Sequence, residues 1–215
     1  MSDKKLIVRR VVCGSLDTNS YVLNNEGCSE CIVIDPADAK EIARVLNSAK
    51  LDVKLILLTH GHFDHIEGVR DLRKWTEAPL AIHELDNAML LDNELNMSHF
   101  FVGEHVVAGN ADVLFHDGDV LDYAGIKLKV IHTPGHSMGG CCFQVADTII
   151  TGDTIFRLSA GRTDGYGGDT EALIASIKSL FALDGDYKLY PGHGDVTSMQ
   201  YERENNTFMK YYASL

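Results

Sequence analysis

The stretch LILLTHGHFDH at residues 55–65 runs from an apolar segment directly into a dense group of polar side chains. Its first half is apolar throughout, as in a strand that is buried on both faces. In the extended chain that follows, His60 and His62 point to the same side. Asp64 and His65 then begin a helix and turn a second pair of donor atoms toward the same region. Nitrogen and oxygen donors this close together predict a site for zinc, iron or manganese.

Three later segments repeat this design, because each places a candidate ligand just after a short apolar strand. The candidates are His136 after Lys127–Ile131, Asp153 after Thr148–Ile150, and His193 after Lys188–Tyr190. A glycine precedes each candidate and gives the turn the freedom to aim it. Because strand ends converge at one edge of layered α/β folds, the three candidates can meet the first cluster there. Five histidines and two aspartates can share two metals, with a carboxylate bridging cations about 3.5–4 Å apart.

Hydrophobic periodicity divides the chain into two strand-rich halves, each followed by helices. The first half begins with strands at Lys5–Val12, Asn19–Leu23 and Cys31–Ile34. Helices are predicted at Ile66–Trp75, Thr170–Phe181 and Ser198–Tyr212. There is no linker, low-complexity tract or repeat, so one domain over residues 1–215 is expected. The pattern predicts an α/β fold, with two mixed sheets packed face to face and helices outside.

The composition is that of a soluble globular chain of 215 residues, with 45% hydrophobic and 23% charged residues. There are 19 basic and 31 acidic side chains, and the formal net charge of −12 argues against nucleic acid or anionic membranes as partners. The longest aliphatic run, at residues 55–58, is far shorter than the ~20 residues that cross a bilayer. The N-terminus lacks the apolar core of a signal peptide, so a cytoplasmic protein is expected.

The five cysteines are an odd number without a signal peptide, which indicates reduced thiols. Cys28 and Cys31 have CxxC spacing, but no second CxxC completes a four-thiolate zinc site. Because they lie between two predicted strands, a hairpin turn is the favoured interpretation. Five further histidines are expected to be surface or hydrogen-bonded core residues rather than ligands: His83, His99, His105, His116 and His132.

With these types and spacings, the seven candidate ligands together resemble the metallo-β-lactamase fold hydrolases. The resemblance covers most of the chain, from the N-terminal strands to His193, and it implies an αββα sandwich with a metal site at one edge of the two sheets. By the family pattern, metal 1 is held by His60, His62 and His136. Metal 2 is held by Asp64, His65 and His193, and Asp153 bridges the two metals. Asp64 and Asp153 are the predicted catalytic residues.

The segment at residues 153–169 carries the subfamily resemblance. Its Gly161-Arg162-Thr163-Asp164 core and the later Gly167-Gly168-Asp169 are similar to the short, single-domain glyoxalase II-type (hydroxyacylglutathione hydrolase-like) enzymes, and in part to persulfide dioxygenases. Glyoxalase II proper has a C-terminal helical region that contacts glutathione, and only about 20 residues follow His193 here. The resemblance therefore favours thioester hydrolysis more strongly than it favours glutathione as the carrier.

The activity implied by the resemblance is metal-dependent hydrolysis, in which a metal-bridging hydroxide attacks the carbonyl of a small-molecule thioester. Two divalent ions are expected, with zinc favoured over iron or manganese. One alternative is a mononuclear iron persulfide dioxygenase, for which two histidines and one aspartate suffice. A second alternative is a metal-binding module without turnover.

Two arginines near Asp153 are candidate substrate-binding residues, because a guanidinium can hold an anionic group with two parallel hydrogen bonds. Arg162 has Asp164 two residues away, which favours a structural ion pair. Arg157 has no such neighbour in the sequence and is the better candidate for contact with substrate. The insert Glu84–Asn110 is expected to cover the site, and a homodimer contact is the alternative role.

Overall fold

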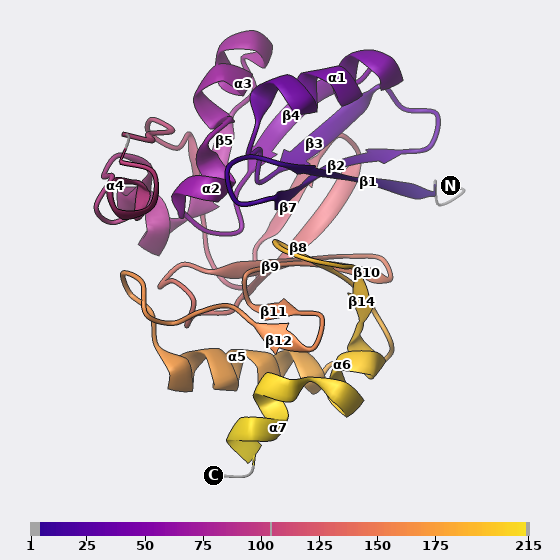
Figure 1. Cartoon of the computed structure of the whole chain (residues 1–215). Coiled ribbons are helices and arrows are strands. Elements are labelled where there is room, and N and C mark those ends of the chain that lie inside the picture. The colour runs from indigo at the N-terminus through magenta and orange to yellow at the C-terminus, as the bar shows by residue number, and fades with distance from the viewer. Residues whose placement is uncertain (1–4, 104, 214–215) are drawn as a thin grey trace.

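The computed structural model describes residues 5–103 and 105–213 of the chain. Two six-stranded sheets pack face to face, and helices cover both outer surfaces, as Figure 1 shows. This arrangement confirms the predicted α/β fold class. The predicted domain and the predicted insert include residues 1–4, 104 and 214–215, which lie outside the described part.

The first sheet has the strand order β1-β2-β3-β4-β5-β6 and is mixed. Its first three strands pair antiparallel, and β3 to β6 run parallel to their neighbours. The strands are β1 (Leu6–Cys13), β2 (Thr18–Asn25), β3 (Glu30–Ile34), β4 (Asp52–Leu57), β5 (Leu80–His83) and β6 (Val113–Phe115). Helices α1 (Ala39–Ala49) and α3 (Val69–Thr76) lie on its outer face (Figure 1).

The second sheet has the order β14-β13-β10-β9-β8-β7, in which only the pair β10 and β13 is parallel. Its strands are β7 (Val120–Tyr123), β8 (Ile126–His132), β9 (Cys141–Val145), β10 (Thr148–Gly152), β13 (Lys188–Pro191) and β14 (Thr197–Ser198). Its outer face is covered by α5 (Thr170–Phe181), α6 (Met199–Asn205) and α7 (Thr207–Ala213) (Figure 1).

Strands that are buried on both faces explain why the apolar runs of the sequence do not alternate with polar residues. Within β2, Tyr21 and Leu23 pack between the two sheets, whereas Val22 packs under α1 and α3. Leu55 and Leu57 of β4 point to the inter-sheet core in the same way. A third cluster joins the second sheet to α5. The two sheets are therefore held together by a continuous apolar layer that ends at the edge where the ligand candidates lie.

Two predicted helices are each divided in the structure. The helix expected at Ile66–Trp75 is instead α2 (Phe63–Ile66) and α3, because the Gly68 N–H donates to Pro36 O at 2.8 Å and ties the turn to the loop between β3 and α1. The helix expected at Ser198–Tyr212 is α6 and α7. Asn206 leaves the helical conformation between them, and its side chain donates to Ser159 O at 2.9 Å. In both places a tertiary contact overrides a continuous helical pattern.

In its described residues, the insert forms two short helical pieces, a 3₁₀ helix η1 (Glu84–Leu90) and α4 (Ser98–Phe101). A small hairpin of β11 (Ile155–Phe156) and β12 (Ser159–Ala160), which the sequence did not predict, follows Asp153. Cys28 lies in the turn between β2 and β3, as predicted. Within the described residues, no helix combines the length and the apolar character needed to cross a membrane.

Candidate metal centre

The first four ligand candidates follow β4 directly, with His60 and His62 in the turn after the strand and Asp64 and His65 in α2. The chain leaves β4 in extended conformation, and the φ of −67° and ψ of 150° at His62 keep it extended until α2 begins. His60, His62, Asp64 and His65 are all at most 6% exposed. Polar side chains this deeply buried need partners. The segment therefore directs all four toward a common interior point, as the sequence predicts.

The other three candidates come from the ends of three strands in the second sheet. His136 follows β8, Asp153 follows β10, and His193 follows β13. Before Asp153, the φ of +45° at Gly152 lies in the left-handed region that favours glycine. Before His193, a Cβ on Gly192 would lie 2.1 Å from Asp153 Oδ1, so only glycine allows this backbone to pass against the ligands.

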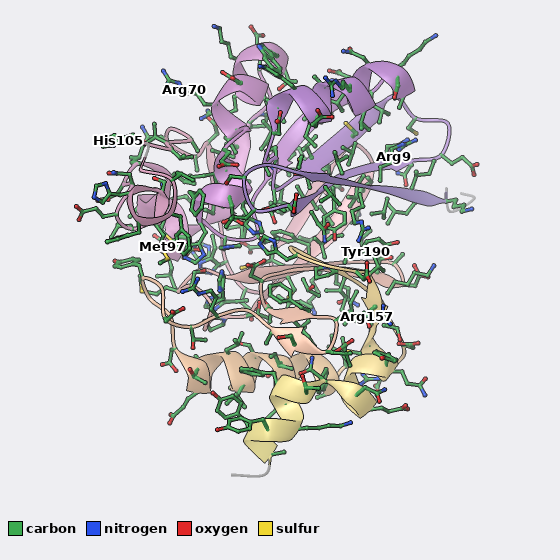
Figure 2. The ribbon with its side chains drawn as sticks, in the orientation of Figure 1. Arg9, Arg70, Met97, His105, Arg157 and Tyr190 are labelled. Carbon is green, nitrogen blue, oxygen red and sulfur yellow. The ribbon has the colours of Figure 1, made fainter. Side chains whose placement is uncertain are left out.

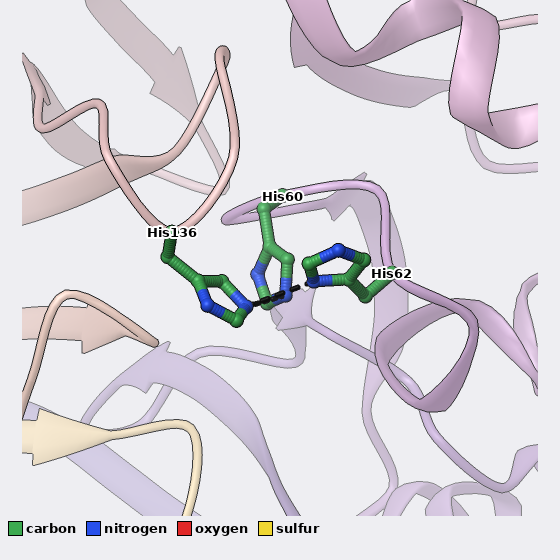
Figure 3. Close-up of side chains that lie close together, drawn as sticks. All are labelled: His60, His62 and His136. Carbon is green, nitrogen blue, oxygen red and sulfur yellow. Dashed lines mark hydrogen bonds between the residues drawn. The ribbon is translucent and has the colours of Figure 1, made fainter. Parts of the chain in front are cut away.

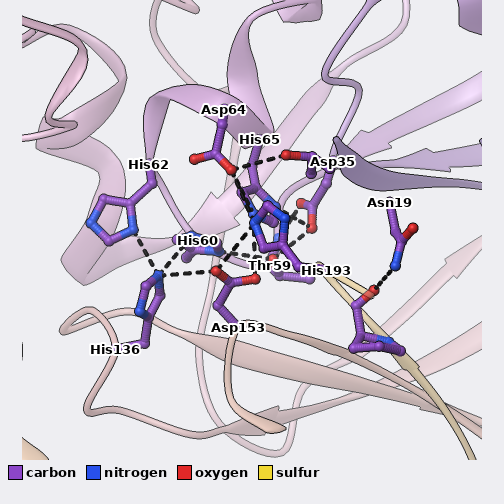
Figure 4. Close-up of polar contacts among 12 residues, drawn as sticks. Asn19, Asp35, Thr59, His60, His62, Asp64, His65, His136, Asp153 and His193 are labelled. Carbon is purple, nitrogen blue, oxygen red and sulfur yellow. Dashed lines mark hydrogen bonds and ion pairs between the residues drawn. The ribbon is translucent and has the colours of Figure 1, made fainter. Parts of the chain in front are cut away.

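All seven candidates meet at one edge of the two sheets (Figure 4). Their donor atoms form groups that lie within 4.8 Å, and two of these groups share no residue: the first set is His60, His62 and His136, and the second set is Asp64, His65 and His193. A third group, His60, His65 and Asp153, overlaps both sets. Asp153 lies between the sets, with Oδ2 at 3.4 Å from His136 Nε2 and Oδ1 at 3.4 Å from His65 Nε2. The site thus has two adjacent groups of three donors, joined by one carboxylate.

The all-histidine set has the spacing of a metal site. His136 Nε2 lies 2.8 Å from His62 Nδ1 and 3.2 Å from His60 Nε2 (Figure 3). Tetrahedral zinc with Zn–N bonds of about 2.05 Å separates two nitrogens by about 3.3 Å. Each nitrogen of a neutral imidazole either donates or accepts a hydrogen bond, so three nitrogens that face one point cannot all satisfy one another. A shared cation can bind all three.

The second set also leaves donor atoms unsatisfied. His65 Nε2 and Asp153 Oδ1 are buried without a hydrogen-bond partner, although they face each other at 3.4 Å. Asp64 Oδ2 accepts a hydrogen bond from Thr18 Oγ1 at 2.9 Å, which fixes its orientation toward His193. Unpaired buried polar atoms are costly, and a cation between them would remove that cost. The residues present therefore fit two divalent ions.

Charge distribution supports the same conclusion. Burial lowers the pKa of His62 to about 3 and holds that of His60 well below its usual range, so both rings are neutral at pH 7. Burial alone would raise the pKa of Asp153, but the facing His65 and His136 lower it to about 2. The carboxylates of Asp64 and Asp153 raise the pKa of His65 despite its burial, so a positive charge is favoured there, and a bound cation would take the place of that proton. Neutral imidazoles and ionised carboxylates are the forms that bind metals.

Outer hydrogen bonds fix which nitrogen points inward in three of the rings, those of His60, His65 and His136. The Nδ1 of His65 donates to Asp35 Oδ2 at 3.0 Å, and that of His136 donates to the backbone oxygen of Arg162 at 2.7 Å. The Nδ1 of His60 lies 3.0 Å from Thr59 Oγ1, which itself donates to Asp35 Oδ2. Such partners set the tautomer and orientation of metal-binding histidines.

Asp35 and Asp86 are two supporting residues that the sequence analysis missed. Asp35 follows β3 just as the ligand candidates follow their strands, so the same rule identifies it. Asp86 is fully buried in η1 and joins the loop that carries His60 to the loop that carries His136. It accepts hydrogen bonds from Gly61 N at 3.1 Å, from Gly139 N at 2.6 Å and from Ser137 Oγ at 2.7 Å.

The two candidate substrate-binding arginines occupy different positions. Arg162 lines the cavity over the donor sets, and its side chain forms the expected pair with Asp164, with two bonds of 2.7 Å. Arg157 is not among the cavity-lining residues. It pairs with Asp195 at 3.3 Å, a partner that the fold brings from 38 residues away. Figure 2 shows Arg157 near α6, on the side of the molecule away from Met97 of the insert.

Histidines outside the two donor sets have other partners. His83 stacks on His132 with ring centroids 4.3 Å apart, and His132 Nε2 donates to Met138 O. His116 pairs with the exposed Glu84 at 2.9 Å. None of the five histidines that the sequence analysis set aside belongs to a group of converging donors within the described residues.

Comparison with known proteins defines the family. The family described as the metallo-beta-lactamase superfamily matches residues 13–193. The chain is 30% identical over 182 residues to hydroxyacylglutathione hydrolase GloC of Haemophilus influenzae, covering 82% of this chain and 86% of that protein. The match covers most of the described fold and all seven ligand candidates, so the chain belongs to the metallo-beta-lactamase superfamily.

Two crystal structures are similar along nearly the whole chain. The B3 metallo-beta-lactamase BLEG-1 is 34% identical, with a TM-score of 0.90 over 94% of this chain and 99% of that one. TTHA1623, in a di-iron-bound form, is 32% identical, with a TM-score of 0.81 over 93% and 98% of the two chains. These similarities, with the converging histidines and aspartates, identify a site for divalent metal.

Proposed function

We propose that this protein is a dinuclear metal-dependent hydrolase of thioesters, similar to the hydroxyacylglutathione hydrolases. The observation that carries the proposal is the position of Asp153, whose carboxylate oxygens lie within 3.6 Å of histidines from both donor sets. A carboxylate in this position is the expected bridge between two cations. The di-iron form of TTHA1623 supports a count of two, and the similarity to GloC supports a thioester substrate.

In this proposal His60, His62 and His136 hold one ion, Asp64, His65 and His193 hold the other, and Asp153 holds both. Two divalent ions supply a nucleophilic water at neutral pH and polarise the substrate carbonyl. The protein orients the ring nitrogens through Asp35, Thr59 and the backbone of Arg162. No serine or cysteine lines the described cavity, so the proposed reaction does not use a side-chain nucleophile.

The test is metal analysis combined with a substrate panel. Protein reconstituted with zinc, iron or manganese is expected to bind close to two equivalents per chain. It should cleave acyl-thiol substrates as fast under nitrogen as in air, because hydrolysis consumes water and not oxygen. A β-lactam and a persulfide complete the panel, with an oxygen electrode recording any uptake.

Three outcomes would contradict the proposal. A firm plateau at one metal, with Asp64 and His193 dispensable, would exclude the dinuclear centre. Turnover of persulfide that requires dissolved oxygen and ferrous iron would identify a dioxygenase. Fully loaded protein that is inactive on every substrate would favour a metal-binding module without turnover.

A further inference from the structure

The cavity above the donor sets is small. It encloses about 180 Å³, and its floor consists of the candidate ligands. Pockets that hold a whole drug-sized ligand usually enclose about 300 Å³ or more. The cavity therefore has room for the reacting bond and one adjoining group, while the rest of the substrate must lie outside it.

The wall facing the donor atoms is apolar and comes from four separate segments. Its side chains are Leu16, Phe63, Met97, Phe101 and Phe156. Phe63 is 2% exposed, and the ring of Phe101 stacks on it at 5.7 Å with an interplanar angle of 23°. Phe101 is itself 46% exposed, so one part of the ring is fixed by packing and another part is available to a ligand.

The permanent cation in this wall, among the described residues, is already paired. Arg162 makes the two bonds to Asp164, and this pairing lowers the pKa of Asp164 to about 2, so the pair is ionised at neutral pH. The Arg162 guanidinium also lies 5.5 Å from the centroid of Phe101. Asp164 already occupies the Nε and Nη2 donors of Arg162, so an anionic substrate group would have to compete with a carboxylate that is held two residues away.

From these contacts we infer that the group next to the scissile bond of the substrate is apolar and uncharged, and that Met97 and Phe101 select it. The inference rests on the proposed thioester hydrolysis and adds a substrate class to it. A carboxylate placed against these two side chains would lose water without gaining a partner. An alkyl or aromatic group would instead bury apolar surface on both sides. Met97 and Phe101 both belong to the insert, which thereby supplies the specificity wall of the cavity.

The test compares two acyl groups of equal length on the uncharged carrier N-acetylcysteamine. Hexanoyl and adipoyl thioesters differ mainly in the terminal carboxylate of the second. For metal-loaded protein, we expect kcat/KM for the hexanoyl thioester to be at least about tenfold higher than for the adipoyl thioester. A factor of about ten is the effect expected when one well-placed apolar contact is lost. Equal values, or a preference for adipoyl, would overturn the inference.

Neighbouring phenylalanines provide a matched pair of variants. Phe101→Ala removes the cavity-lining ring and should lower the hexanoyl preference about tenfold. Phe100→Ala removes a ring of the same helix that is 71% exposed and does not line the cavity, so the preference should be unchanged. Melting temperatures verify that both variants fold. The same effect in both variants would exclude a specific role for Phe101.

Releasing Arg162 offers a gain-of-function test. Asp164→Asn removes the carboxylate that pairs with Arg162 but keeps the side-chain size. The ratio of adipoyl to hexanoyl activity should then rise severalfold, because the guanidinium becomes available to the carboxylate. An unchanged ratio would contradict the argument that pairing with Asp164 makes the cavity unsuitable for anions.

Binding of an inert analogue separates this inference from the proposed function. S-hexyl-N-acetylcysteamine is a thioether that cannot be hydrolysed, and its binding to metal-loaded protein can be measured by calorimetry. Phe101→Ala should weaken binding about tenfold and Phe100→Ala should not. If no thioester is cleaved, the proposed function fails, and this measurement still decides the inference. Equal dissociation constants in the two variants would reject it.

Discussion

The two halves of the molecule build their shares of the metal centre in different ways. The first sheet contributes four donors from one segment of six residues, His60 to His65. The second sheet contributes His136, Asp153 and His193 from the ends of three strands that are distant in sequence. The first group is arranged by local geometry. The second is arranged by strand order and by the packing of one sheet on the other.

This difference shows which substitutions should disturb the positions of the ligands. The contiguous segment brings its four donors together through its own backbone and is supported by Thr18, Asp35 and Asp86. The three strand ends, by contrast, are brought together only by contacts between distant parts of the chain. Asn19 of β2 supplies such contacts, since its side chain donates to Pro191 O at 2.9 Å and to Gly194 O at 2.8 Å, on either side of His193. Asp86 supplies another set between the His60 and His136 loops. Substitutions can therefore test each half and each connection separately.

The largest effect is expected for Asp153→Asn, which changes the carboxylate that lies against histidines of both donor sets. An amide keeps the shape but loses the negative charge, so both metals should bind more weakly. Activity should fall by more than about 100-fold, since even residues outside the ligand set often cost 10–100-fold. Elemental analysis and chelator competition measure each site. His60→Ala, in the contiguous segment, should weaken mainly one metal.

Asp122→Asn is the control for that experiment, because Asp122 is exposed and pairs with Lys127, which is not a candidate ligand. It should retain both metals and full activity. If Asp153→Asn lost one metal while the other kept its native affinity, Asp153 would not be a bridge. The two halves would then hold independent sites.

The second prediction concerns the connection through Asp86. In the native protein, both carboxylate oxygens of Asp86 accept hydrogen bonds. In Asp86→Asn the amide NH₂ replaces one of these oxygens and faces a donor, so at least one buried hydrogen bond is lost. Metal affinity should fall about tenfold, and unfolding free energy by about 1–3 kcal/mol. Chelator competition and denaturant unfolding measure the two effects. Unchanged metal affinity despite lower stability would mean that Asp86 supports the fold but does not position the ligand loops.

The difference between the contiguous segment and the three separate strand ends also explains how much of the site can be predicted from the sequence. The segment at residues 60–65 is predictable because the ligand spacing and the strand end are local features. Assigning His136, Asp153 and His193 to the same site depends on the general rule that strand ends converge, and the structure brings them there. Asp86 was missed because its partners Gly61 and Gly139 lie 25 and 53 residues away. The divided helices were missed for the same reason, since tertiary contacts at Gly68 and Asn206 interrupt a continuous local pattern.

The third prediction contrasts the metal centre with the histidines outside it. His83 is 5% exposed, and burial, reinforced by His132 and His116, lowers its pKa to about 4. In the unfolded chain the ring titrates near its usual pKa of about 6.5, so the unfolded state binds more protons between these values. The free energy of unfolding should therefore fall as the pH drops through this range, by about 2 kcal/mol at pH 5 relative to pH 8.

His83→Asn isolates this contribution. The Asn oxygen can still accept the hydrogen bond that Leu85 N donates to His83 Nδ1 at 3.2 Å, but it does not titrate. Denaturant unfolding of both proteins across pH 5 to 8 gives the difference between the two curves. The curve of the variant should be flatter on the acid side. Parallel curves would show that the metal ligands, rather than His83, set the acid sensitivity.

The smallest effect is expected for Arg157→Ala, in the turn of the β11–β12 hairpin, because Arg157 is not among the residues that line the cavity. The sequence gives Arg157 no nearby acid, but the fold pairs it with Asp195 at 3.3 Å and places it 5.7 Å from the ring centroid of Tyr201. Arg157 and Asp195 are 48% and 69% exposed, and an exposed pair contributes about 0–1 kcal/mol. The melting temperature should thus fall by at most a few degrees. KM for neutral and anionic thioesters should change less than about twofold, because the substitution removes no contact with the substrate. A KM that rises severalfold for anionic substrates alone, with an unchanged melting temperature, would instead make Arg157 a substrate contact and extend the binding surface beyond the cavity to the β11–β12 hairpin.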